Sequence, residues 1–192
     1  MSLKHALLGV LAARPMNGYA LSRFFASSQN WVWSAPQSQI YSALKGLESE
    51  GLIEARREEG KNGLDSKVFS LTDAGRGLLL GWVATSHDSP PVRDAFALQA
   101  LYFDSVPAEA ARAVLEDFIE TQIRLCDEWT TQRDALAVGD TPLLRERLAH
   151  RPRSEHARIS RLKAHVFDGQ VRQAQVRIDW AREAIALLDE PG

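Results

Sequence analysis

The chain has 192 residues, 45% of them hydrophobic and 25% charged, which allows one large domain or two modest domains with a buried core. Charges or glycines interrupt every hydrophobic stretch, so a membrane-spanning helix is excluded, and the first residues lack the layout of a signal peptide. The single cysteine, Cys126, excludes a disulfide within the chain and a multi-cysteine zinc site, and we expect a cytoplasmic protein. The net charge of −2 argues against a nucleic-acid partner, but the charge is unevenly distributed. Residues 1–87 hold 9 basic and 7 acidic residues (net +2), whereas the remainder holds 14 basic and 18 acidic residues (net −4).

Residues 1–87 predict the element order of a winged helix-turn-helix. Apolar residues at helical spacing from Leu3 indicate a first helix, which Arg14-Pro15 ends. Asn17-Gly18 predicts a turn in which Asn17 caps a second helix. A loop that carries Trp31 and Trp33 separates this helix from the next.

A third helix and a hairpin follow. The helix begins at residues 34–36, with Pro36 in its first turn, and ends at Gly51, a residue that readily adopts the left-handed conformation. Two strands, at 52–57 and 67–71, flank a tip at 60–63. Thr72 is expected to cap a further helix that runs through Val83.

The prolines and polar residues of 85–91 mark the strongest boundary, so the prediction is a DNA-binding domain at 1–87 and a helical dimerisation domain at 88–192. The second domain is expected to contain a short helix at 94–102, a long helix from Pro107, a loop at 139–152 with one short helical turn, and a long helix at 154–188. The fold class is therefore mainly α with a small β-hairpin.

Both long helices carry apolar seams, which are wider than one partner helix needs. Packing against a second copy would cover them, and this predicts a homodimer. The seams consist of Ala111, Leu115, Phe118, Gln122, Leu125 and Trp129 in the first helix, and of Ile159, Leu162, Val166, Val176, Trp180 and Leu187 in the second.

The third helix carries the functional argument. Ile40, Leu44 and Leu47 share one stripe, while the opposite face holds hydroxyls, one tyrosine and one lysine, and no acid. Such side chains can bind phosphates and base edges, and the helix start enters the major groove in folds of this kind. An ordinary solvated helix face is the alternative, and the position of this helix within a tri-helical unit favours DNA. The hairpin, or wing, carries Lys61 and Lys67, which would place cations near the DNA phosphates. The alternative is an ordinary solvated hairpin with no DNA contact.

Several linked motifs resemble the PadR family, and the Ser-Gln-Ile-Tyr segment is similar to its virulence-activator branch. They are Gly18-Tyr19-Ala20-Leu21, the run from Ser38 to Glu48, Glu50-Gly51-Leu52-Ile53, and the run from Ser70 to Arg76. Phe69 departs from the family, which often has tyrosine there. The resemblance implies a homodimeric regulator, usually a repressor, that binds a pseudo-palindromic operator and is released by a small, often aromatic effector.

The candidate DNA-contacting residues are Tyr19, Gln37, Ser38, Gln39, Tyr41, Ser42, Lys45, Lys61 and Lys67. Trp129 is the candidate effector contact, although core packing explains most of the five tryptophans. No catalytic residue, metal site or cofactor is predicted, since the five histidines are scattered and no phosphate-binding loop is present. Two rival functions are a protein-interaction module that never touches DNA, and a ligand-binding or enzymatic tail with a vestigial winged helix.

Overall fold

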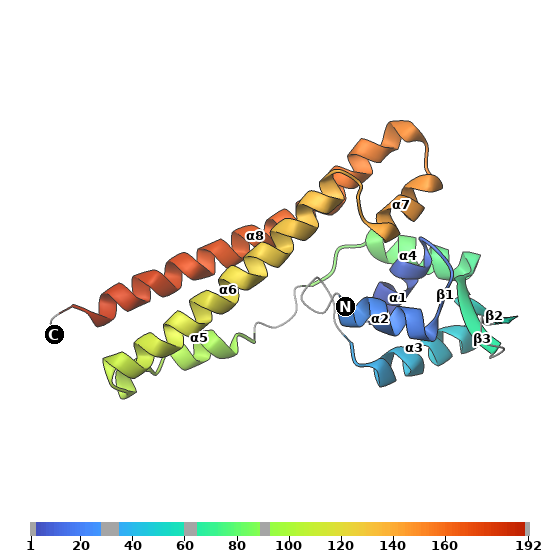
Figure 1. The fold of residues 1–192 in the computed structure, drawn as a ribbon. Helices are drawn as coiled ribbons and strands as arrows, with labels where there is room; N and C mark the ends of the chain where they lie inside the picture. The colour runs from blue at the N-terminus through green and yellow to red at the C-terminus, as the bar shows by residue number, and fades with distance from the viewer. Residues whose placement is uncertain (1–2, 28–34, 60–64, 89–92, 191–192) are drawn as a thin grey trace. The chain divides into compact units, whose positions relative to one another are not determined.

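The computed structural model describes residues 3–27, 35–59, 65–88 and 93–190, and the chain forms two compact units (Figure 1). The first unit comprises Met1–Ser89 and Asp140–His156, and the second comprises Pro90–Gly139 and Ala157–Gly192. Residues 140–156, which the sequence analysis assigns to the second domain, thus group with the N-terminal elements.

The first unit has the predicted element order of a winged helix-turn-helix. Its elements are α1 (Leu3–Leu11), β1 (Met16–Asn17), α2 (Gly18–Ser27), α3 (Gln37–Ser49), β2 (Ile53–Glu59), β3 (Asp65–Leu71), α4 (Asp73–Val83) and α7 (Pro142–Ala149). The loop with Trp31 and Trp33 and the hairpin tip at 60–63 lie outside the described residues.

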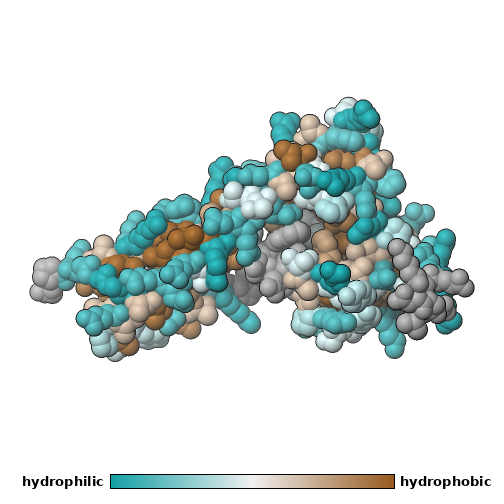
Figure 2. Space-filling view, viewed as in Figure 1, coloured by the Kyte–Doolittle hydropathy of each residue, from teal (hydrophilic) through white to brown (hydrophobic). Residues whose placement is uncertain are grey.

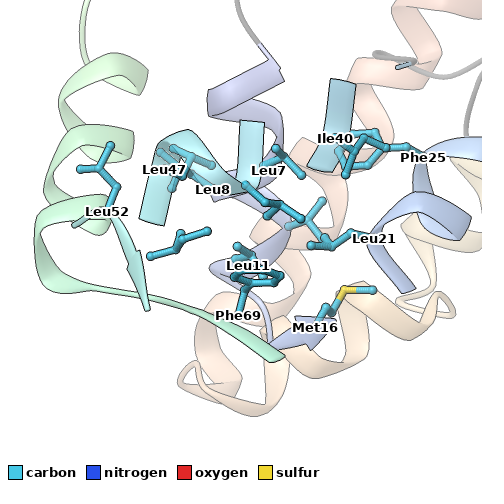
Figure 3. Close-up of a cluster of buried hydrophobic side chains, with 13 residues drawn as sticks. Leu7, Leu8, Leu11, Met16, Leu21, Phe25, Ile40, Leu47, Leu52 and Phe69 are labelled. Atoms are coloured by element: carbon cyan, nitrogen blue, oxygen red, sulfur yellow. The ribbon is translucent and has the colours of Figure 1, made fainter. Parts of the chain in front are cut away.

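A single apolar cluster holds α1, α2, α3 and the sheet together (Figure 3). On α3, Ile40, Leu44 and Leu47 are 0–2% exposed, so the stripe that the periodicity predicts is the buried face. Each such buried side chain stabilises the unit by about 1.5–3 kcal/mol relative to exposure. The other buried members are Leu7, Leu8, Val10, Leu11, Met16, Leu21, Phe25, Leu52, Ile53 and Phe69.

The sheet has three strands in the order β1-β3-β2, and not only the predicted hairpin. In β1, Met16 pairs with Phe69 and Asn17 pairs with Val68. Asn17 also caps α2 as predicted, because its side-chain oxygen accepts a hydrogen bond from the Ala20 amide at 2.7 Å. The turn at residues 17–18 is therefore a strand end and a helix cap at once.

The helix ends of this unit follow the residues that predict them. Gly51 adopts φ +70° after α3, and the Thr72 hydroxyl accepts a hydrogen bond from the Gly75 amide at 3.1 Å. Pro36 lies one position earlier than predicted, as the residue that caps α3, so the helix itself begins at Gln37.

The predicted loop at 139–152 contains the eight-residue helix α7, which is longer than the expected single turn. Leu143 packs against the apolar cluster, and the Arg147 guanidinium donates a hydrogen bond to the Gly9 carbonyl at 2.8 Å. Burial lowers the pKa of Arg147, and the like charges of Arg151 and Arg76 act in the same direction. These contacts with α1 explain why residues 140–156 belong to the first unit.

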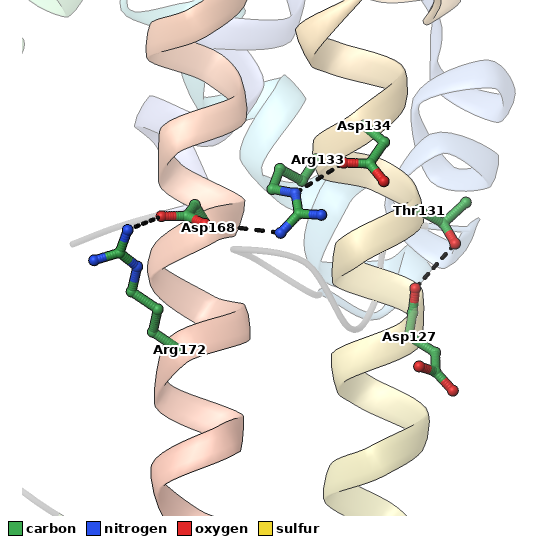
Figure 4. Close-up of polar contacts among 6 residues, drawn as sticks. All are labelled: Asp127, Thr131, Arg133, Asp134, Asp168 and Arg172. Carbon is green, nitrogen blue, oxygen red and sulfur yellow. Dashed lines mark hydrogen bonds and ion pairs between the residues drawn. The ribbon is translucent and has the colours of Figure 1, made fainter.

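The second unit contains α5 (Ala95–Ala100), a 3₁₀ turn η1 (Phe103–Ser105), α6 (Ala108–Ala137) and most of α8 (Arg153–Leu188). Asp94 caps α5 and pairs with Arg177 of α8 at 2.8 Å, and the Arg177 hydrogen bond lowers the pKa of this carboxyl. Phe96 stacks on Phe118 of α6 with ring centroids 3.7 Å apart. An ion pair of 3.8 Å between Arg133 and Asp168 joins α6 to α8 farther along (Figure 4).

The apolar face that α8 buries within the chain differs from the predicted seam. The buried residues are Ser160, Ala164, Phe167, Ala174, Ile178 and Ala181. On α6 the prediction holds better, with Ala111, Leu115, Phe118 and Gln122 buried, whereas Leu125 and Trp129 are half-buried.

The larger apolar residues of the predicted α8 seam are exposed. We call Leu162, Val166, Val176, Trp180 and Leu187 the outer stripe; they are 59%, 48%, 67%, 41% and 65% exposed. At 100° per residue they fall within about 80° of one another, roughly opposite the buried face. Hydrophobic side chains also reach the surface along the paired α6 and α8 in Figure 2. Trp180 is 41% exposed, but its ring also packs edge-on against Phe96 and Phe118, with centroids 6.0 and 6.4 Å apart.

Candidate nucleic-acid interface

The face of α3 opposite the apolar cluster is open to solvent. Ser38, Tyr41, Ser42 and Lys45 are exposed on it, as the helical periodicity predicts, and Gln37 and Gln39 are exposed at the start of the helix. Tyr41, the largest of them, is 45% exposed. The sequence therefore predicted four of the candidate residues on this face and two at the start of the helix, and three buried aliphatic side chains hold α3 rigidly on the unit.

The lysine on this face, Lys45, is available to bind a phosphate. Lys45 forms no ion pair with any other described residue, and the one acidic residue of α3, Glu48, pairs with Lys67 of β3 at 2.7 Å. Ser49 is occupied within its own helix, because its hydroxyl donates a hydrogen bond to the Gly46 carbonyl at 2.8 Å. An exposed lysine without an acidic partner can attract a phosphate.

The wing candidates differ from one another. Lys67 contacts Glu48 and lies 5.5 Å from the centroid of the Phe69 ring, so it must leave the carboxylate before it can bind a phosphate. The sequence could not reveal this pair, because the two residues lie on different elements. Lys61 lies outside the described residues.

An open pocket of about 460 Å³ lies between α2 and the beginning of α3. Tyr19, which is 63% exposed, lines it together with Gln37 and Arg23. Arg23 is absent from the predicted set, although its position four residues after Tyr19 places both on one side of α2. Among the described residues Arg23 has no acidic partner, and we add it to the candidates as a cation for a backbone phosphate.

The candidate effector residue lies elsewhere. Trp129 is half-buried on α6, in the second unit, and it does not line the pocket beside α3. Cys126 nearby is a half-buried free thiol. Within the described ranges, no group of three or more His, Cys, Asp or Glu side chains is placed to hold a metal ion. None of the helices in those ranges is long and apolar enough to cross a membrane.

Comparison with known proteins points to one family. Residues 7–80 match the Transcriptional regulator PadR-like family. The chain is 33% identical over 127 residues to the negative transcriptional regulator PadR of Bacillus subtilis, covering 65% of this chain and 70% of that protein.

Solved structures match the whole fold. The crystal structure of Bacillus subtilis PadR in complex with operator DNA matches with a TM-score of 0.77, at 24% identity over 97% of this chain and 99% of the other. The same protein in complex with p-coumaric acid matches with a TM-score of 0.72, at 25% identity over 98% and 99%. The Vibrio cholerae virulence activator AphA matches with a TM-score of 0.68, at 27% identity over 98% of each chain. This chain therefore belongs to the PadR-like family of transcriptional regulators.

Proposed function

We propose that this regulator is a cytoplasmic, homodimeric repressor, which binds a pseudo-palindromic DNA operator and leaves it when a small aromatic molecule binds. The observation that carries the proposal is the exposed face of α3, which has no acid and is held by Ile40, Leu44 and Leu47. The operator complex of Bacillus subtilis PadR supports DNA as the partner, and the name of that relative, a negative regulator, supports repression.

On DNA, α3 enters the major groove with its N-terminal end first. Gln37 and Gln39 then lie near base edges, where an amide can bind the N6 and N7 positions of adenine, and Ser38 and Ser42 add hydroxyls. Lys45 binds the phosphate backbone, and Tyr41 meets either a phosphate or a thymine methyl group.

The wing and α2 supply the flanking phosphate contacts. Lys61 and Lys67 approach the backbone from the hairpin, while Tyr19 and Arg23 approach it from α2. Lys67 contributes less than a free lysine, because each phosphate contact requires it to give up Glu48.

Two copies of the chain are needed because one winged helix with a net charge of +2 holds DNA weakly. A two-fold dimer places two α3 helices about 34 Å apart, one helical turn of DNA. The outer stripe of α8 is the apolar surface that such a dimer would cover.

The α3 face yields the first prediction. Lys45→Ala should weaken binding to every DNA sequence and lower the slope of log K against log salt by about one unit. Gln37→Ala and Tyr41→Ala should instead cost about 1–3 kcal/mol on the preferred sequence and reduce the preference for it. The measurement is a titration of duplex DNA at several salt concentrations, after footprinting upstream of the protein's own gene has located the site.

Ser49→Ala is the matched control, because the Ser49 hydroxyl bonds its own helix, and it should bind like the unaltered chain. Full affinity in all three α3 variants, with folding intact, would remove this helix from the groove. A chain that binds no DNA at any salt concentration would favour the protein-interaction module instead.

The effector yields the second prediction. A planar aromatic acid should quench the fluorescence of Trp129 and cause the protein to release the operator. The p-coumaric acid complex of Bacillus subtilis PadR suggests that acid as the first probe. A ligand can act only through different affinities for the DNA-binding and released states. Trp129→Phe should weaken release without changing operator affinity in the absence of ligand. Binding of the acid with no change in DNA affinity would contradict this regulation.

A further inference from the structure

Gly18, the first residue of α2, lies directly beneath the ring of Tyr41. A Cβ atom built on Gly18 would lie 2.6 Å from Cε1 of Tyr41, 3.1 Å from Cζ and 3.3 Å from the hydroxyl oxygen. Real Cβ contacts are essentially never as short as the first of these distances. The outer end of the tyrosine ring thus rests on backbone that only glycine leaves uncovered.

The backbone at Gly18 is held in place from several sides. Asn17 pairs with Val68 in the sheet, and its side-chain amide donates a hydrogen bond to the Ser66 hydroxyl at 3.1 Å. The Ser22 hydroxyl donates a hydrogen bond to the Gly18 carbonyl at 2.9 Å. A side chain at position 18 cannot push this backbone away, so the ring of Tyr41, which is the end of a side chain, has to move.

We infer that Gly18 is a positioning residue for sequence recognition, and that it fixes the orientation of Tyr41 on the exposed face of α3. The inference rests on the proposed function, because Tyr41 belongs to the DNA-reading surface only if α3 enters the groove. A ring already held against α2 loses little rotamer freedom on binding, and its hydroxyl keeps one position relative to Ser38 and Ser42. Gly18 itself makes no contact with DNA in this arrangement.

The test uses the intact chain and a duplex that the unaltered protein selects from a randomised DNA pool. Gly18→Ala should bind this duplex about 10-fold more weakly and discriminate less against altered bases. Its urea midpoint should stay unchanged, because the ring yields and alanine suits a helix at least as well as glycine. Gly46→Ala, on α3 with open space around its Cβ position, is the matched control and should bind normally.

A double-mutant cycle separates positioning from a general structural role. In the Tyr41→Ala background, Gly18→Ala should cause no further loss, because no ring remains to be displaced. Independently of DNA, a ring-current shift of the Gly18 α-protons should be present in the unaltered chain and absent in Tyr41→Ala.

Three results would overturn the inference while the proposed function stands: full operator affinity in Gly18→Ala, equal losses in both backgrounds, or a Gly18→Ala chain that does not fold. A chain that selects no sequence from the pool would contradict the proposed function itself, and with it any reading role for Gly18.

Discussion

Val176→Glu combined with Leu187→Glu should convert the proposed dimer into a monomer and lower its operator affinity by about 100-fold or more. Both residues belong to the outer stripe of α8 and are 67% and 65% exposed in the single chain. Their replacement leaves the intrachain core intact, because α8 uses its opposite face to pack within its own unit. In a dimer that covers the stripe, each glutamate would be buried without a partner, which is strongly unfavourable.

Sedimentation velocity of the intact chain, followed by DNA titration, is the measurement. The intact chain is the right material, because α7 supplies Leu143 and Arg147 to the first unit and a fragment ending before α6 would lose them. Val138→Glu is the matched control, an 80% exposed valine at the end of α6, outside the stripe. Persistence of the dimer in the double variant, or tight operator binding by its monomer, would refute the assignment of this surface.

Gly75→Ala should destabilise the protein by about 3 kcal/mol, because the added methyl group has nowhere to go. A Cβ on Gly75 would lie 2.0 Å from the Leu52 carbonyl oxygen and 2.8 Å from Cδ1 of Leu71. The first obstacle is backbone, and it is held in place, since the Leu52 carbonyl accepts a hydrogen bond from the Thr72 amide at 3.2 Å. The Thr72 hydroxyl in turn donates a hydrogen bond to the Gly51 carbonyl at 2.8 Å. Relief of the clash therefore requires α4 to move off the sheet.

Gly77→Ala is the internal comparison for this prediction, measured by the same urea denaturation. Gly77 lies two residues farther along α4, with nothing within 4 Å of its Cβ position. Alanine there should stabilise the helix by about 0.5–1 kcal/mol. Equal effects of the two substitutions would show that helix propensity, and not the contact with Leu52, determines the outcome at Gly75.

Gly18 and Gly75 separate two consequences of the same substitution. At Gly75 the added methyl group would meet a backbone carbonyl that is fixed by the sheet, so the substitution lowers the stability of the fold. At Gly18 the added methyl group would meet the end of a tyrosine side chain, so the substitution lowers the affinity and selectivity for DNA. A stability screen alone would detect the first and miss the second.

Local patterns in the sequence determined the winged helix and the exposed face of α3. The apolar stripe of Ile40, Leu44 and Leu47 can be buried in only one orientation of α3, because the other side of that helix is polar throughout. Asn17, Thr72 and Gly51 mark helix ends through interactions that span only a few residues, so their roles can be predicted from composition and spacing.

Only the tertiary structure decided how elements distant in sequence meet. The two-residue strand β1 is too short to show an alternating pattern, and its pairing depends on β3, about fifty residues later. The Lys67–Glu48 pair and the packing of Arg147 on Gly9 likewise join different elements, which no local pattern reports.

Helix α8 shows most clearly what local patterns cannot predict. It has two apolar faces, and periodicity alone does not tell which of them is buried within the chain. Within the chain it buries a face rich in small residues, Ala164, Ala174 and Ala181, which lets another helix approach closely. The larger side chains of the outer stripe remain exposed in the single chain. The sequence by itself determined that α8 is amphipathic, and the distribution of side-chain volume in three dimensions decided which face packs inward.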